Sequence, residues 1–366
     1  MEIDIPAERR QVFEEAWRVM KNRFYDPKMH GADWAAAKDT YESMLPFIAD
    51  TEELHNVIME MIGDMNASHT GISAGGLIPG RTEQEERVQT RYPGFDMEAD
   101  ASGYFKVSYI YRKGPADHEY VKLAVGNYIL GLNDKDLKTS DNYWKLFNIL
   151  PGRKFEFLVN SKPSADGAWT VSLDPLTAAA QSDLAYDRWV EQRKAITKAI
   201  SGGEIGYLHI KAMDAPSLAK FQLELAENQD KKALIIDERF NGGGGIDQEL
   251  LEILNQRKPY QSTRNRDSLV VQRPGLAYFG PLAVLQNERS ASDAEMFPAG
   301  IRDLGLGKIV GVPTMGAVIG TGSFTLMDGS VLRTPGAGVS TASGQNMENY
   351  GVPPDVWVDN TPARCV

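Results

Sequence analysis

The sequence has a single cysteine among 366 residues, Cys365, so no disulfide can form within the chain. With one thiol beside the C-terminus, neither a cysteine-based metal site nor a catalytic thiol is expected. No apolar run approaches the roughly 20 residues that cross a bilayer. The acidic start, Met1 to Asp4, is not followed by the apolar segment of a secretory signal. These absences predict a cytoplasmic protein with no membrane partner.

An excess of basic residues is also missing. The chain has 39 Lys and Arg against 50 Asp and Glu, a net charge of −11. This balance disfavours nucleic acid or an anionic membrane as the main partner. Apolar residues make up 42% of the chain, which indicates a folded protein rather than a disordered one. At roughly 150 residues per domain, the length indicates two to three domains.

Residues 1–75 are predicted to form a helical bundle. The apolar residues between Val12 and Met20 recur at helical spacing, and a second helix is expected over 34–47. A third begins after the capping residue Asp50 and leads into a short polar stretch that contains Ser68-His69.

Residues 76–91 form a linker that is rich in glycine and then in charge. From residue 92 the sequence changes to short β segments, with strands expected over 105–111, 127–133 and 154–159 and a brief helix over 142–149. This order, preceded by a Gly-Pro pair, resembles a PDZ domain. An inserted PDZ-like β domain is therefore expected over 92–176.

The remaining residues, 177–366, alternate between strands and helices, which predicts an α/β catalytic core with a parallel-rich sheet and flanking helices. Strands are expected over 206–210, 233–237, 282–286 and 308–312. Helices are expected over 187–200, 218–227 and 246–255, and another from about Ser292. The continuous apolar strands favour a sheet that is covered on both faces.

A glycine-rich segment follows the apolar strand over 233–237. It runs from Asp237 to Gly245 and includes four consecutive glycines. Such a turn lets backbone N–H groups approach a ligand closely. It could hold a phosphate, although the Lys-Ser/Thr pair of a P-loop is missing. It could equally donate to an oxyanion, or be a plain structural turn.

Ser292 stands where the next strand turns into a helix. A serine on such a turn can expose its Oγ while the following backbone N–H points to the same place. The alternative is structural, because Ser292 and Glu295 have the spacing of a capping box.

Two further residues have sequence contexts that fit a catalytic site. Among five histidines, only His69 lies in a turn of small residues at the end of a helix. Glu348 lies between a Gly/Ser-rich stretch and the pair Pro353-Pro354. A structural histidine and a solvated loop glutamate are the alternatives.

Taken in order, these segments resemble the carboxy-terminal-processing (tail-specific) serine proteases, and more closely the C-terminal catalytic half of tricorn-type proteases. The resemblance spans residues 7 to 360. Tail-specific enzymes use a Ser-Lys dyad, but Ala317 stands where that lysine would be. The tricorn pattern instead takes a Ser-His pair from the helical region and a glutamate near the C-terminus, which Ser68-His69 and Glu348 match.

The resemblance implies that Ser292 is the nucleophile and His69 the general base, with Ser68 and Glu348 orienting and polarising the imidazole. This is the logic of a Ser-His-acid triad with an additional hydroxyl. A neutral imidazole, with an unperturbed pKa near 6.5, suits a base that acts around pH 7.

The resemblance further implies an oxyanion hole made by Gly243 and the backbone N–H of Asp293. It implies peptide substrates, no cofactor, no metal and a homo-oligomer. We thus predict a serine peptidase that cleaves oligopeptides or unfolded polypeptides through an acyl-enzyme. A catalytically inactive peptide- or ligand-binding protein on the same fold is the alternative, and an esterase is a third.

A preference for basic residues at the cleavage position would need a carboxylate in the pocket. The segment in which we expect that carboxylate is basic instead, although Asp247 or Asp267 could reach the pocket. Its cationic residues are Arg257, Lys258, Arg264 and Arg266. We therefore expect uncharged or acidic residues to be preferred over Lys or Arg.

Overall fold

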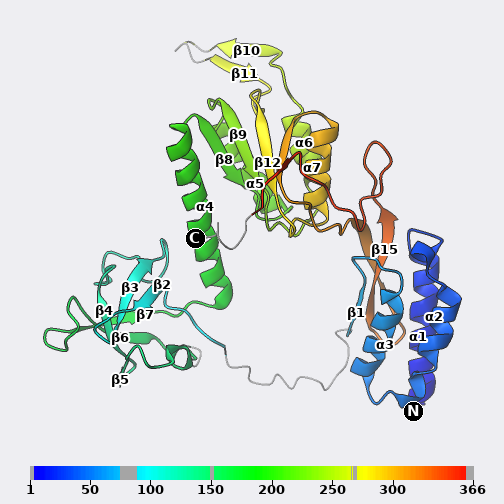
Figure 1. Cartoon of the computed structure of the whole chain (residues 1–366), viewed down its shortest axis with the longest axis horizontal. Coiled ribbons are helices and arrows are strands. Elements are labelled where there is room, and N and C mark those ends of the chain that lie inside the picture. Colours follow the sequence, from blue (N-terminus) through cyan, green and yellow to red (C-terminus); the bar gives the residue numbers. More distant parts are fainter. Residues whose placement is uncertain (1–3, 75–88, 149–151, 265, 267–269, 360–366) are drawn as a thin grey trace. The chain divides into compact units, whose positions relative to one another are not determined.

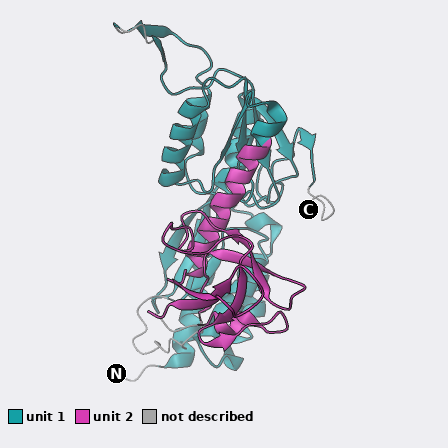
Figure 2. Cartoon of the chain, turned by 90° about the vertical axis from the view of Figure 1, so that its left-hand side faces the viewer, with its two compact units in different colours: residues 1–81, 197–366 teal, residues 82–196 magenta. Residues whose placement is uncertain are grey.

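The computed structural model describes residues 4–74, 89–148, 152–264, 266 and 270–359 (Figure 1). Most of the expected linker, Cys365 and Asp267 lie outside these residues. The chain divides into two compact units, residues 1–81 with 197–366 and residues 82–196 (Figure 2). In the described part of the chain, no helix has both the length and the apolar character of a membrane span.

The N-terminal region is helical, as predicted. It contains α1 (Ile5–Arg23), α2 (Trp34–Glu42) and α3 (Thr51–Gly63), and an aspartate caps the N-terminus of each. Asp50 caps α3 by accepting the N–H of Glu53 at 2.9 Å. An acceptor at this position satisfies an N–H that has no partner within the helix.

The helix expected over 34–47 is shorter than predicted. α2 ends at Glu42, and a separate 3₁₀ helix covers Leu45–Phe47. Pro46 explains the break, because proline has no N–H to donate and disfavours helical geometry in the residue before it.

The N-terminal helices share their core with a β-hairpin that was not predicted. β14 (Ile319–Thr325) and β15 (Val331–Gly338) pair antiparallel, and β1 (Gly71–Ser73) pairs with β15. Leu332 of this sheet is fully buried in the same apolar cluster as residues of α1 and α3. The pairing of β1 with β15 therefore fixes the segment that directly follows His69.

The other sheet of this unit is five-stranded and wholly parallel, in the order β16-β13-β12-β9-β8. Its strands are β8 (Ile205–His209), β9 (Ala233–Asp237), β12 (Leu282–Gln286), β13 (Gly307–Gly311) and β16 (Val356–Trp357). Four of these match the predicted strands to within one residue. Their carboxyl ends lie at one edge of the sheet, where α/β proteins commonly place their sites.

Three helices connect the strands of this sheet: α5 (Ala215–Glu227), α6 (Asp247–Leu254) and α7 (Asp293–Asp303). Buried residues of all three join one apolar cluster with Leu234 and Val284. On the opposite face, Ile235 and Leu285 are only half-buried. The three connecting helices lie on one face, because right-handed crossovers between strands that are added in one direction place their helices on the same side of a sheet. The other face is therefore only partly covered, where the continuous apolar strands favoured cover on both.

The unit of residues 82–196 is built on an antiparallel sheet in the order β2-β3-β4-β6-β7, with β5 paired to β4. The strands are β2 (Phe95–Ala99), β3 (Phe105–Ile110), β4 (Tyr128–Leu132), β5 (Lys135–Asp136), β6 (Phe155–Asn160) and β7 (Trp169–Leu173). The helix expected over 142–149 is a single 3₁₀ turn, Tyr143–Leu146.

Two elements remain. α4 (Ala178–Ser201) begins nine residues before its predicted start at 187 and runs from one unit into the other (Figure 2). β10 (Gln261–Arg264) and β11 (Val270–Arg273) form an antiparallel hairpin in which every strand residue is exposed.

Candidate active site

Ser292 lies at the carboxyl edge of the parallel sheet, where it is the N-cap residue of α7. The chain leaves β12 at Gln286 and turns sharply before the helix starts. Ser292 adopts a positive φ of 58°. Such a conformation is uncommon for a residue with a side chain and is found at sites where strain is retained for function.

Ser292 and Glu295 form the capping box that their spacing indicates. The Glu295 carboxylate accepts the Ser292 N–H at 3.1 Å, as a capping box requires. The Ser292 Oγ lies 3.2 Å from the Nε2 atom of His69. The glutamate thus holds the backbone of the serine while its hydroxyl meets an imidazole.

His69 reaches this position from the turn that follows α3. Its backbone also has a positive φ, 58°, and its carbonyl accepts a hydrogen bond from the Thr321 hydroxyl at 3.3 Å. The hairpin that was not predicted from the sequence therefore helps to hold His69.

Ser68 and Glu348 complete a chain of contacts behind the imidazole. The Ser68 Oγ lies 2.7 Å from the His69 Nδ1 and donates to the Glu348 carboxylate at 3.0 Å. That carboxylate also accepts the N–H groups of Ser68, at 2.6 Å, and Val318, at 2.8 Å. The four side chains that the resemblance singled out are thus connected from Ser292 to Glu348.

This geometry assigns the tautomer of His69. A hydroxyl has one proton, and that of Ser68 is directed to a carboxylate, which only accepts. The Ser68 oxygen must then accept the proton on the His69 Nδ1. The Nε2 atom of neutral His69 is therefore unprotonated and faces Ser292 as an acceptor.

The surroundings of His69 favour its neutral form. Burial lowers the pKa of His69, and the positive charge of Arg333 lowers it further, while the Glu348 carboxylate opposes both. Desolvation and a nearby cation both penalise the protonated imidazole. His69 is thus held in the state in which it can accept a proton.

We expect peptidase activity to rise with pH through an apparent pKa below the ordinary histidine value of about 6.5. Below that pKa, kcat/KM should fall about tenfold per pH unit, because only neutral His69 accepts the serine proton. A profile of kcat/KM against pH measures this. A flat profile, or an active His69→Ala variant, would contradict it.

A second group near the site requires a control for that profile. The Asp293 carboxylate accepts the N–H groups of Ile246 and Asp247, at 2.8 and 3.1 Å. Burial, together with the nearby Asp247 carboxyl, raises the pKa of Asp293 to about 7. An inflection near pH 7 that disappears in Asp247→Asn belongs to this acidic pair, and one that remains below 6.5 belongs to His69.

The glycine loop lies directly against Ser292. A Cβ atom added to Gly243, which has a φ of +97°, would lie 2.7 Å from the Ser292 Cβ. The Gly243 N–H donates to the Asn241 side chain at 2.9 Å, whereas no acceptor for the Asp293 N–H is found within the described residues. Of the two expected oxyanion donors, Asp293 is available and Gly243 is already engaged.

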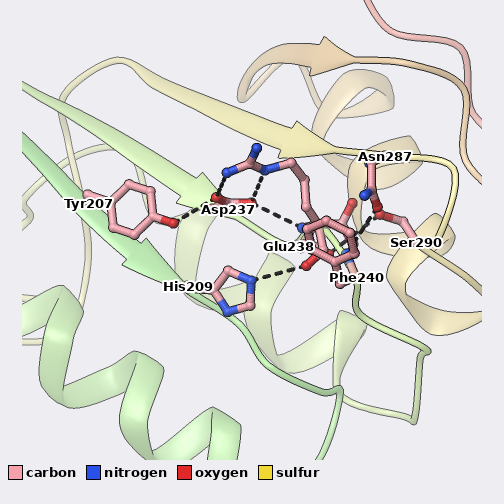
Figure 3. A network of polar contacts seen from close by, with 8 residues as sticks. Tyr207, His209, Asp237, Glu238, Phe240, Asn287 and Ser290 are labelled. Atoms are coloured by element: carbon pink, nitrogen blue, oxygen red, sulfur yellow. Dashed lines mark hydrogen bonds and ion pairs between the residues drawn. The ribbon is translucent and has the colours of Figure 1, made fainter. Parts of the chain in front are cut away.

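A polar network fixes the glycine loop to the turn that carries Ser292 (Figure 3). The Asn287 side chain accepts the Phe240 N–H at 3.0 Å, and the Asn287 N–H donates to the Ser290 Oγ at 3.2 Å. The Ser290 hydroxyl is thus used inside the turn. The backbone N–H of Ala291 adds a bond to the Asn241 carbonyl at 3.0 Å.

The start of this loop is held by a buried ion pair. Asp237, fully buried, accepts two hydrogen bonds from the Arg239 guanidinium, at 2.9 and 2.6 Å, and one from the Tyr207 hydroxyl at 2.7 Å. A buried carboxylate needs such partners to offset the loss of water. The ion pair therefore positions the glycine loop rather than a substrate.

Glu238, the next residue, is buried in a different way. Both of its carboxyl oxygens lack a hydrogen-bond partner among the residues that the structure describes. Burial raises its pKa well above the ordinary value, because a neutral acid costs far less to bury than a carboxylate.

The remaining histidines have other contacts. His30 bonds to Tyr25, His55 to Ser330, and His209 to the Arg239 carbonyl, while His118 stacks on the ring of Tyr120. Among the residues described, no group of three or more His, Cys, Asp or Glu is arranged to hold a metal ion.

Sequence reasoning missed three contributors: the Val318 N–H, the Thr321 hydroxyl and the Asn241 side chain. The first is a backbone donor, and the other two are side chains that bond to the backbone of His69 or Gly243. Residue type and spacing do not predict such contacts. Glu295 was considered only as a helix cap, although its spacing from Ser292 was visible.

Two parts of the chain match known domains. Residues 204–358 match peptidase family S41, and residues 5–63 match the tricorn protease C1 domain. The first match contains the glycine loop, Ser292 and Glu348. The second contains all of α1, α2 and α3, and it ends with α3 at Gly63.

Whole-chain comparisons give the same relatives. Tricorn protease homolog 1 of Streptomyces coelicolor is 28% identical over 98% of this chain, which covers 34% of its length. Tricorn protease of Thermoplasma acidophilum is 26% identical over 96% of this chain, which covers 33% of its length. The chain thus spans about a third of these curated relatives.

A solved structure agrees with these matches. The crystal structure of the tricorn protease superposes with a TM-score of 0.81 at 25% identity, covering 98% of this chain and 35% of that one. Its similarity extends over both the helical region and the parallel sheet. Residues 204–358 thus resemble the serine-type peptidases of family S41, residues 5–63 resemble the tricorn protease C1 domain, and the chain is similar over nearly its whole length to tricorn-type proteases.

Proposed function

We propose that this chain hydrolyses peptide bonds of oligopeptides or unfolded polypeptides, with Ser292 as nucleophile. The observation that carries the proposal is the connected series Ser292, His69, Ser68 and Glu348. In this series the Ser292 hydroxyl lies 3.2 Å from the Nε2 atom of His69. The other ring nitrogen, Nδ1, is bonded to the Ser68 hydroxyl, which in turn bonds to Glu348. Such an arrangement activates a hydroxyl that is unreactive by itself.

In acylation, the Ser292 Oγ attacks the carbonyl carbon of the scissile bond and its proton passes to the His69 Nε2. The positive charge on the imidazolium is stabilised through Ser68 by the Glu348 carboxylate. The tetrahedral intermediate collapses as its C–N bond breaks, and the departing amine takes the proton from His69. The product is an ester between Ser292 and the acyl half of the peptide.

In deacylation, a water molecule attacks the ester carbonyl carbon and gives its proton to the His69 Nε2. The second tetrahedral intermediate then releases the carboxylic acid, and His69 returns the proton to the Ser292 Oγ. Both halves of the cycle use the same base, so neutral His69 is required twice.

The negative charge on each tetrahedral intermediate needs donors that are already in place. The Asp293 N–H meets this need, because it follows the nucleophile. Gly243 borders the same place, and its N–H would have to be shared between Asn241 and the substrate oxygen. We assign Asp293 and Gly243 to the oxyanion hole on these grounds.

The domain arrangement is part of the proposal. We assign a helical region to residues 1–75, a linker to 76–91, a PDZ-like domain to 92–176 and the α/β core to 177–366. The antiparallel sheet of β2 to β7 supports the PDZ-like assignment. Such domains bind peptide ends by strand addition, which suits a peptide substrate. A homo-oligomer remains a prediction from the resemblance.

Labelling by a fluorophosphonate probe tests the proposal against the alternative of an inactive binding protein. A serine peptidase should react at Ser292 and then lose activity in proportion to the labelled fraction. A protein that binds peptides without labelling or turnover would overturn the proposal. Hydrolysis of simple esters with no hydrolysis of peptides would favour an esterase.

We further expect cleavage after uncharged or acidic residues rather than after Lys or Arg. Arg257 is occupied by the carbonyls of Tyr278 and Gly280. Arg333 already places a positive charge near His69. Repulsion from that charge disfavours the cationic side chain of a substrate Lys or Arg.

Turnover of a peptide library by the purified protein measures this preference. Arg333→Gln, with Arg273→Gln as an exposed matched control, should weaken the rejection of basic residues. A tenfold preference of the parent chain for Lys or Arg, about 1.4 kcal/mol in the transition state, would show that the pocket is acidic.

A further inference from the structure

The Glu295 carboxylate is fully buried and accepts four hydrogen bonds. One oxygen accepts the N–H groups of Ser292 at 3.1 Å and Ala317 at 2.8 Å. The other accepts the Thr314 hydroxyl at 2.5 Å and the Gly316 N–H at 2.7 Å. Both oxygens are thus used only as acceptors, by donors from two separate segments.

These donors connect Glu295 to the nucleophile. Ser292 has a strained positive φ, which persists only where its surroundings hold it. The bond from its N–H to Glu295 is one such restraint. The position of the Ser292 Oγ relative to His69 therefore depends on Glu295.

The other donors connect Glu295 to the acidic end of the catalytic series. The segment 314–317 leads directly to Val318, whose N–H is bonded to Glu348. The Thr314 hydroxyl, which donates to Glu295, accepts the Val352 N–H at 2.7 Å. Glu295 thus restrains the segment 314–317, which leads to a donor of Glu348, and through Thr314 it also restrains Val352, four residues after Glu348.

We propose that Glu295 is a positioning residue that sets the Ser292 nucleophile and the Glu348 carboxylate in register with His69. This inference rests on the proposed peptidase function and deepens it. Glu295 touches neither substrate nor the reacting atoms, so its effect is on geometry. A displacement of about 1 Å at such a site can lower turnover about 100-fold.

Glu295→Gln tests the proposal with little change in volume. The amide has one acceptor oxygen, so two of the four buried donors would face an NH₂ group and lose their partner. We expect kcat per titrated active site to fall about 10- to 100-fold while KM stays within about threefold. The rate of fluorophosphonate labelling should fall by the same factor, and the apparent pKa of the His69 limb should stay unchanged.

Glu224→Gln is the matched control, because Glu224 is also buried but lies on α5, outside the site. It should change thermal stability without changing kcat per active site. Thr314→Val provides a second probe if Glu295→Gln folds poorly. It should lower kcat, and the double variant should lose less than the product of the two single effects.

The outcomes separate the two proposals. If the parent chain neither labels nor cleaves peptides, the proposed function fails. If the parent is active and folded Glu295→Gln or Thr314→Val keeps kcat within about twofold of it, Glu295 has no positioning role. A loss of kcat equal in Glu224→Gln and Glu295→Gln would also overturn the inference, since it would reflect stability alone.

Discussion

Ser292→Ala is expected to abolish peptide hydrolysis and fluorophosphonate labelling. The Ser292 Oγ is the hydroxyl that lies 3.2 Å from the unprotonated nitrogen of His69. Removing the nucleophile of a serine peptidase lowers kcat on the order of 10⁶-fold. Turnover of a fluorogenic peptide and mass spectrometry of the labelled protein measure the two effects.

Ser290→Ala is the matched control, two residues away in the same turn. The Ser290 side chain is fully buried, and its hydroxyl accepts the Asn287 N–H. Its loss should lower the free energy of unfolding by about 1 kcal/mol and leave a substantial part of the activity. Equal loss of activity in both variants, or labelling at Ser290, would reverse the assignment.

The parts of the fold that were predicted well are those with a local signal. β9 and β12 were predicted to the residue because each is a short apolar run ended by polar or turn-forming residues. α4 was predicted too short because its first turns are rich in alanine and lack an apolar stripe. Alanine has the highest helix propensity, and that propensity was not weighed.

The hairpin of β14 and β15 was missed for the opposite reason. Glycines recur along both strands, and glycine is depleted in strands because it adds no side chain to pack. Pairing with β1 and packing of Leu332 on the N-terminal helices stabilise it instead. Those contacts join segments more than 200 residues apart, which no local pattern reports.

The candidate site shows the same division. Each of Ser292, His69 and Glu348 lies at a boundary that the sequence marks, but 223 residues separate the serine from the histidine. Periodicity and spacing could not bring them together. Their grouping came from resemblance to a family. Glu295 was visible as part of a helix cap, yet its bonds to residues 314–317 depend on tertiary structure.

Gly243→Ala is expected to lower kcat/KM at least about 100-fold, which is about 2.7 kcal/mol in the transition state. The new Cβ would lie 2.7 Å from both the Ser292 Cβ and the Ala291 carbonyl oxygen. The backbone of residue 243 also has a φ of +97°, which disfavours any side chain. The loop or the nucleophile must shift, and the place of the oxyanion shifts with it.

Gly245→Ala, in the same loop, separates this effect from a general cost of replacing glycine. A Cβ on Gly245 would meet no atom within 4 Å, so kcat/KM should stay within about threefold of the parent value. Circular dichroism and thermal unfolding of both variants show whether each is folded. A folded Gly243→Ala variant with activity close to that of Gly245→Ala would show that the oxyanion forms away from Gly243. The oxyanion would then need a second donor other than Gly243 beside the Asp293 N–H.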